Sequence, residues 1–146
     1  MGDPYKAGKF KLNPYYDKTD VEGSLVVILD GIMDNRGLEL ITPISRCVCK
    51  HEIHELIFTN EQAKPGDIVN KIAYLGFVEI ECGGVLIAGD TVELDGQVIG
   101  ILAGFDETHM PNHQNIVINS TDLFAGKELQ ARLGSKIKFK LSSRRN

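Results

Sequence analysis

The feature that most constrains the fold is a series of short β-rich runs separated by turn signals. Valine, isoleucine, threonine and aromatic residues are enriched in strands, and Gly-Asp or Gly-Ser pairs precede several of the runs. The expected strands occupy residues 24–30, 46–50, 71–81, 97–105, 115–119 and 136–141. Asp95-Gly96 lies between TVEL and QVIG, and this dipeptide is the strongest short hairpin signal in the chain.

Helical potential is confined to residues 120–134, which read STDLFAGKELQARLG. Ser120 or Thr121 could cap a helix there, but Gly126 interrupts it, so one or two turns are expected. Strands do not alternate with long amphipathic helices, which argues against a parallel doubly wound sheet.

Glycines inside the expected strands suit the tight bends of a closed barrel. In VIGILAGF, residues 98–105, both alternating faces are apolar, which indicates a strand covered on both sides. The predicted fold is all-β: a small, mostly antiparallel, closed or partly open β-barrel with one short helix at most.

A chain of 146 residues suits a single domain with its own core. Residues 24–146 are expected to form the barrel domain, and residues 1–23 an N-terminal arm rich in aromatic and charged side chains. The aromatic side chains of the arm are better buried than solvated. We therefore expect them to cover the barrel or a second chain, which favours a homodimer. They are Tyr5, Phe10, Tyr15 and Tyr16.

The formal net charge of −4 and the lack of a strongly basic block argue against nucleic acid as a partner. No apolar run is long enough for a membrane-spanning helix, and the N-terminus lacks the apolar core of a secretory signal. Three cysteines in no disulfide-framework spacing indicate reduced thiols, so a cytoplasmic location is expected. Phosphate-binding, dinucleotide-binding and common hydrolase motifs are absent, so no cofactor is predicted and a non-enzymatic role is favoured.

The stretch GFDETHMPNHQNIVI, residues 104–118, concentrates titratable side chains between two expected strands. Functional groups gather on ordered loops above rigid sheets, so we expect this loop to form a wall of the principal ligand site. Pro111 excludes a continuous helix with both histidines on one face, so the histidines meet only if the loop folds back. The predicted ligand-binding residues are Asp106, Glu107, His109, His113 and Asn115.

A second cluster, CVCKHEIHEL at residues 47–56, suggests a metal site. The candidate ligands are Cys47, Cys49, His51 and His54. On a strand the first three would share a face, but the outer two would lie roughly 13 Å apart, too far for one tetrahedral metal. We therefore interpret the cysteines as small apolar core residues and the histidines as residues at the end of a strand.

From about residue 56 to residue 141 the order of features resembles the glucitol/sorbitol-specific IIA component of the bacterial phosphotransferase system. The resemblance runs through LIFTNEQAKPGDIVNKIAYLGFVEI, GGVLIAGDTVELDGQVIGILAGF and HQNIVINSTDLFAGKELQARLGSKIKF. It rests on glycines and apolar rhythm, and it implies a small β-barrel. Members of that family accept a phosphoryl group on a histidine in a strand that reads like I-H-C-H-G.

The chain departs from this family at the phosphoacceptor. The corresponding strand, residues 72–80, contains no histidine, cysteine, serine or aspartate, and phosphoryl transfer needs a nucleophilic imidazole there. The leading hypothesis is a ligand- or partner-binding, regulatory module without phosphoryl transfer, serving a small molecule or a protein. The alternatives are a metal-binding protein or enzyme that uses residues 104–115, and a phosphocarrier whose histidine has moved.

Overall fold

The computed structural model describes residues 14–142, which form twelve strands and no helix. In chain order the strands are β1 (Val21–Ile28), β2 (Ile32–Met33), β3 (Leu38–Glu39), β4 (Ser45–Val48), β5 (Ile53–Thr59), β6 (Ile68–Val69), β7 (Ile72–Cys82), β8 (Gly84–Ile87), β9 (Thr91–Leu94), β10 (Gln97–Asp106), β11 (Asn115–Asn119) and β12 (Lys136–Lys140). In this part of the chain, therefore, no helix is long and apolar enough to cross a membrane.

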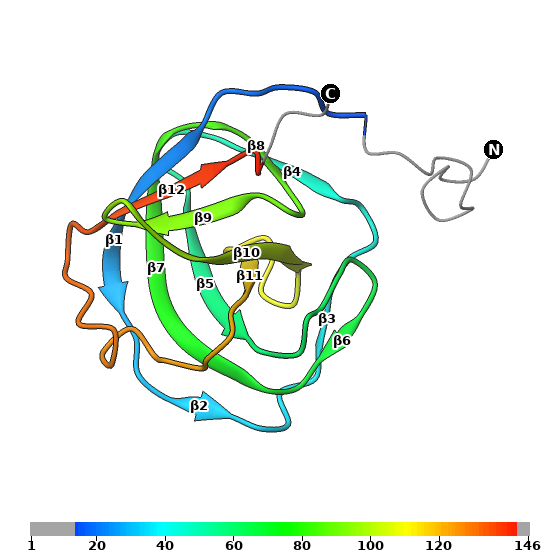
Figure 1. The fold of residues 1–146 in the computed structure, drawn as a ribbon, viewed down its shortest axis with the longest axis vertical. Helices are drawn as coiled ribbons and strands as arrows, with labels where there is room; N and C mark the ends of the chain where they lie inside the picture. The colour runs from blue at the N-terminus through cyan, green and yellow to red at the C-terminus, as the bar shows by residue number, and fades with distance from the viewer. Residues whose placement is uncertain (1–13, 143–146) are drawn as a thin grey trace.

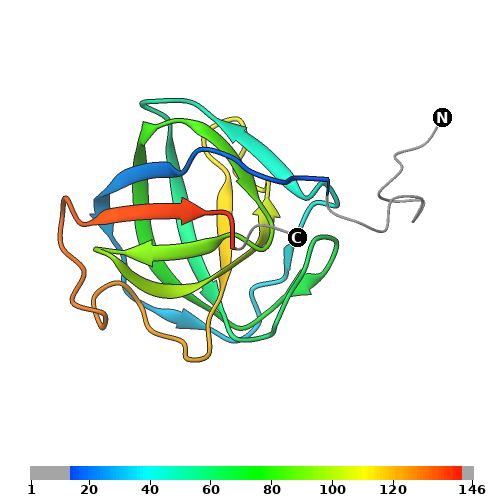
Figure 2. The ribbon, with the colours of Figure 1, turned by 45° about the horizontal axis from the view of Figure 1, so that its top comes forward.

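The main sheet curls into a ring (Figures 1 and 2). It has eight strands in the order β1-β12-β9-β10-β11-β5-β7-β2, and an additional pairing of β1 with β7 closes the ring and leaves β2 outside it. All of these pairings are antiparallel except the one between β5 and β11. The predicted fold class, an all-β and mostly antiparallel ring of short strands, is confirmed.

The interior of the ring is filled by aliphatic side chains and three fully buried phenylalanines, Phe58, Phe105 and Phe139. A second apolar cluster includes Leu40 and Ala103 and lies where the β3–β6 ribbon covers β10 and β11. Because of this cover, β10 from Leu102 onward is buried on both faces, as its apolar sequence predicts.

The β9–β10 hairpin turns at Asp95-Gly96, as the sequence predicts, and both turn residues have positive φ.

Gly76 lies where β7 passes close to β1. A Cβ atom built on Gly76 would lie 2.2 Å from the carbonyl oxygen of Val27, so only glycine permits this approach.

The segment at 120–134 forms short hydrogen-bonded turns rather than a helix, one over residues 125–131 and a second at 132–135. In the first, the backbone N–H of Leu129 donates to the carbonyl of Ala125, and the Glu128 carboxylate accepts from the N–H of Ala125. This turn is therefore capped by Glu128, not by Ser120 or Thr121. Gly126 lies inside it and is packed against β7, where a Cβ would lie 2.0 Å from the Leu75 carbonyl oxygen.

All six expected strands are present, as β1, β4, β7, β10, β11 and β12, but the forecast missed β5, although this strand lies inside the main sheet between β11 and β7. Its first residues include His54 and Glu55, which are charged or polar yet buried, so the segment lacks the usual apolar signature. The short strands β2, β3, β6 and β8 were also not expected. β1 begins at Val21, three residues before the expected start of the barrel domain.

Residues 14–20 of the expected arm lie against the ring. The hydroxyls of Tyr15 and Ser45 share a hydrogen bond of 2.9 Å, and the Lys18 ammonium donates to the Asp90 carboxylate at 2.7 Å. Of the four aromatic residues expected to be buried, Tyr15 is half-buried, whereas Tyr16 is 59% exposed and so does not cover the ring. Tyr5 and Phe10 lie outside the described residues.

Candidate functional site

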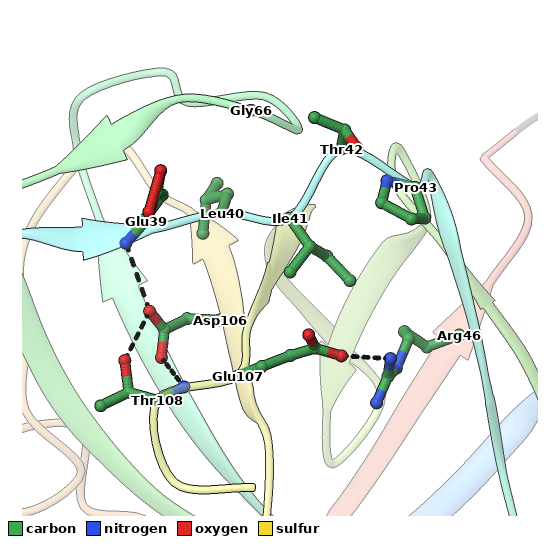
Figure 3. A pocket seen from close by; sticks show the side chains of 10 residues that line it. All are labelled: Glu39, Leu40, Ile41, Thr42, Pro43, Arg46, Gly66, Asp106, Glu107 and Thr108. Atoms are coloured by element: carbon green, nitrogen blue, oxygen red, sulfur yellow. Dashed lines mark hydrogen bonds and ion pairs between the residues drawn. The ribbon is translucent and has the colours of Figure 1, made fainter. Parts of the chain in front are cut away.

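The connection from β10 to β11 begins at Asp106, whose buried carboxylate fixes the start of the loop. It accepts hydrogen bonds from the backbone N–H of Glu39 at 3.2 Å, from the N–H and hydroxyl of Thr108 at 2.9 and 3.0 Å, and from the Asn115 amide at 3.1 Å. The bond from Glu39 ties the loop to β3 (Figure 3), and the bond from Asn115 ties it to the start of β11. Asp106 is thus an anchor, with its hydrogen-bonding capacity largely used inside the protein.

The next residue, Glu107, forms an ion pair with Arg46 of β4. Arg46 also donates from Nε to the side-chain oxygen of Gln114 at 3.1 Å. The guanidinium therefore bridges the two ends of the β10–β11 loop. The side chains of Arg46 and Glu107 are 28% and 41% exposed, so solvent and small molecules can reach the pair.

A cleft of about 620 Å³ opens between the β3–β4 connection and this loop. Figure 3 shows Ile41 and Pro43 on one side, Glu107 and Thr108 on the other, and Arg46 at one end. The lining residues are Glu39, Leu40, Ile41, Thr42, Pro43, Arg46, Gly66, Asp106, Glu107 and Thr108.

His109 and His113 come together because the loop folds back. The N–H groups of Asn112 and His113 both donate to the carbonyl of His109, and the two imidazole ring centroids lie 5.1 Å apart. His113 packs edge-on against Phe77 and has its Nε2 atom 3.4 Å from the Glu55 carboxylate.

The histidine pair is separate from the cleft. Of the five residues predicted to bind a ligand, Asp106 and Glu107 line the cleft, whereas His109, His113 and Asn115 do not. Asn115 is fully buried and donates to Asp106, so it supports the loop from beneath.

The four candidate metal ligands do not converge. Cys47 and Cys49 are exposed, so the interpretation of these cysteines as core residues is wrong. Val48 is the buried residue here, because β4 alternates its faces and turns the two cysteines outward.

The two histidines of that segment point to different carboxylates. His51 is exposed, with its Nδ1 atom 3.4 Å from Glu79, whereas buried His54 lies 3.2 Å from Glu52 through Nε2. A hydrogen bond from the Cys49 backbone and a weaker one from His54 lower the pKa of Glu52. Within residues 14–142, no three histidine, cysteine, aspartate or glutamate side chains are placed to hold one metal ion.

Several residues of the cleft have no signal in the sequence. Ile41, Thr42 and Pro43 lie in an irregular connection of ordinary composition, about 65 positions before the loop they face. Arg46 is the first residue of a β-rich run whose cysteines, and not its arginine, suggested a site. These residues could be assigned to the cleft only if the pairing of the strands were known.

The ring of strands and the cleft between the β3–β4 connection and the β10–β11 loop define an all-β protein with a loop-walled cleft. The chain belongs to DUF6917, a family of unknown function whose model matches residues 15–140. No curated protein and no solved structure matches the chain.

Proposed function

We propose that the protein is a binding module for a small molecule, which occupies the cleft between the β3–β4 connection and the β10–β11 loop. The observation that carries this proposal is the preformed loop wall, which Asp106 holds in place through four hydrogen bonds. The cleft volume of about 620 Å³ falls within the ordinary range for small-molecule sites, which are usually largely preformed.

The charges of the cleft favour a cationic ligand. Its lining contains three carboxylates and one guanidinium, so the formal charge is −2. The Arg46 charge is compensated by Glu107, and the Asp106 charge is satisfied by internal donors. Glu39 is exposed, and its carboxylate has no partner within residues 14–142, so it is the group free to pair with a ligand ammonium.

The apolar side chains of the cleft indicate the chemistry of the uncharged part of the ligand. Ile41 and Pro43 offer hydrocarbon surface opposite the Glu107–Thr108 edge (Figure 3), and Thr42 adds a hydroxyl. The best match is a small amine with a short aliphatic body, whose ammonium meets Glu39 while its chain lies along Ile41.

Thermal-shift and calorimetric titrations test this assignment. The probes are aliphatic diamines such as putrescine and cadaverine, with the diacids succinate and glutarate as their oppositely charged counterparts. We expect the diamines to raise the melting temperature, with an affinity that falls as salt is added. Glu39→Gln should weaken diamine binding roughly fivefold, the factor that corresponds to about 1 kcal/mol for a partly exposed ion pair.

Asp122→Asn is the matched control, because Asp122 is also an exposed carboxylate without a partner in the described part of the chain and lies outside the cleft. It should leave the diamine affinity unchanged. Binding of the diacids alone, or equal loss of affinity in both variants, would refute the cationic-ligand assignment.

The proposed module performs no phosphoryl transfer. This part of the proposal rests on the composition of residues 72–80 in β7, which would carry the phosphoacceptor in the glucitol/sorbitol IIA component that the chain resembles. An enzymatic role has no comparable support, because the histidine pair lies apart from the cleft.

A further inference from the structure

Strand β10 pairs with β9 along its first half and with β11 along its second half, and the two ladders overlap only at Ile101. Within the described part of the chain, residues 97–100 therefore have β9 on one edge and no strand on the other. β11 ends at Asn119, which lies opposite Ile101, and the chain continues through Ser120, whose N–H still bonds to Thr59 of β5, without pairing with residues 97–100. Among the described residues, no backbone hydrogen bond reaches the second edge of 97–100.

This free edge lacks the usual protection against pairing with another strand. Natural edge strands carry charges, prolines or covering segments that block edge-to-edge association. Residues 96–105 read GQVIGILAGF and contain no charge and no proline. The edge strand β2 differs, since Asp30 and Asp34 flank its two exposed apolar residues.

A groove of about 820 Å³ runs beside the free edge. Val98, Ile101 and Phe124 present apolar surface in it, with exposed fractions of 63%, 40% and 44%. The remaining lining consists of Ile99, amides, hydroxyls, backbone and one ionisable side chain, Asp122. The groove therefore fits an extended segment that is itself uncharged.

We propose that this edge is the interface of a homodimer, in which residues 97–100 of two copies pair as antiparallel strands about a two-fold axis. A two-fold axis brings residues 97–100 of one copy against the same residues of the other, so the segment must be compatible with itself. Residues 97–100 meet this condition because they carry no charge that would repel the second copy. The exposed Val98 side chain of each copy also meets apolar surface of the other. A charged partner strand would find only the single carboxylate of Asp122 to pair with.

The oligomeric state of the full chain, measured by sedimentation from micromolar to millimolar concentration, tests the proposal. The wild-type protein should dimerise, and Val98→Lys should raise the dimer dissociation constant at least about tenfold, since charge on an edge strand opposes pairing. Ile68→Lys is the matched control, because Ile68 in β6 is also aliphatic and 63% exposed but lies outside the groove. It should dimerise like the wild type.

Amide hydrogen exchange of the wild-type chain gives a second readout that does not depend on the folding of a variant. Exchange at Val98–Gly100 should slow as protein concentration rises, while exchange in β2 should not change. A chain that stays monomeric at millimolar concentration, or a Val98→Lys variant that dimerises as tightly as the wild type, would overturn the proposal. A monomer that instead captures uncharged peptides at residues 97–100 would also overturn it, in favour of a heterologous partner.

Discussion

Removing one partner of the buried ion pair between Lys18 and Asp90 should destabilise the protein strongly, and Lys18→Met tests this. The two side chains are only 7% and 0% exposed, and the Lys18 ammonium donates at 2.7 Å to both the Asp90 carboxylate and the Val85 carbonyl. Without Lys18, the Asp90 carboxylate keeps one donor, the N–H of Ile87 at 3.0 Å, and its Oδ1 atom already accepts no bond from residues 14–142.

Removing one partner of a buried pair leaves an uncompensated charge, which costs about 3–5 kcal/mol. For a chain of this length a loss of about 3 kcal/mol lowers the melting temperature by roughly 10 °C. Urea denaturation of the wild-type and variant proteins measures the difference in the free energy of unfolding.

Two comparisons distinguish the cost of an uncompensated buried Asp90 charge from the effect of removing any lysine. Lys127→Met removes a pair with Asp30 that spans 3.8 Å between exposed side chains, so its effect should stay below about 1 kcal/mol. Adding Asp90→Asn to Lys18→Met removes the orphaned charge and should restore part of the lost stability. If Lys18→Met costs no more than Lys127→Met, the reasoning fails.

The same pair predicts a pH dependence with a definite sign. Burial raises the pKa of Asp90 above its usual value, with the Lys18 hydrogen bond opposing the shift. A carboxyl with a raised native-state pKa binds its proton more tightly when folded, so its contribution to stability grows as pH falls through that pKa. In Lys18→Met the opposing cation is gone, so the deficit relative to wild type should shrink on acidification. A deficit that is constant or grows on acidification would contradict this account.

Three further outcomes follow from the fold and the loop. Asp106→Ala leaves several donors without a partner and should cost about 2–3 kcal/mol, with faster proteolysis within the β10–β11 loop than in the wild type. Gly76→Ala forces a methyl group to within 2.2 Å of the Val27 carbonyl oxygen and should cost about 1–3 kcal/mol, whereas Gly84→Ala, with its nearest neighbour at 3.2 Å, should cost less by the same urea titration. Incubation with phosphoenolpyruvate and the two general phosphotransferase proteins should leave no acid-labile, base-stable phosphate on the chain, and stoichiometric phosphohistidine would show that the carrier chemistry has moved elsewhere.

The candidate site was only half predictable from the sequence. The β10–β11 loop is conspicuous because its polar residues are contiguous, and Asp106 and Glu107 do line the cleft. The opposite wall is formed by residues 39–43 and Arg46, whose composition is ordinary. Arg46 contacts Glu107 across 61 positions of sequence, and no local pattern encodes such a contact.

The sequence by itself determined the local elements. The Asp95-Gly96 hairpin, the boundaries of β11 and the absence of a long helix all follow from turn chemistry and side-chain branching, which act within a few residues. The tertiary structure alone decided how these elements pair. β5 contains buried His54 and Glu55, so its sequence lacks the apolar pattern that predicts a strand. It lies inside the sheet because β11 pairs with one of its edges in parallel and β7 pairs with the other antiparallel. The pairing of β1 with β7 closes the ring, and the pairing of β4 with β8 holds the strand that carries Arg46, whose side chain meets Glu107. These pairings join segments that are distant in the chain, so no local sequence pattern encodes them.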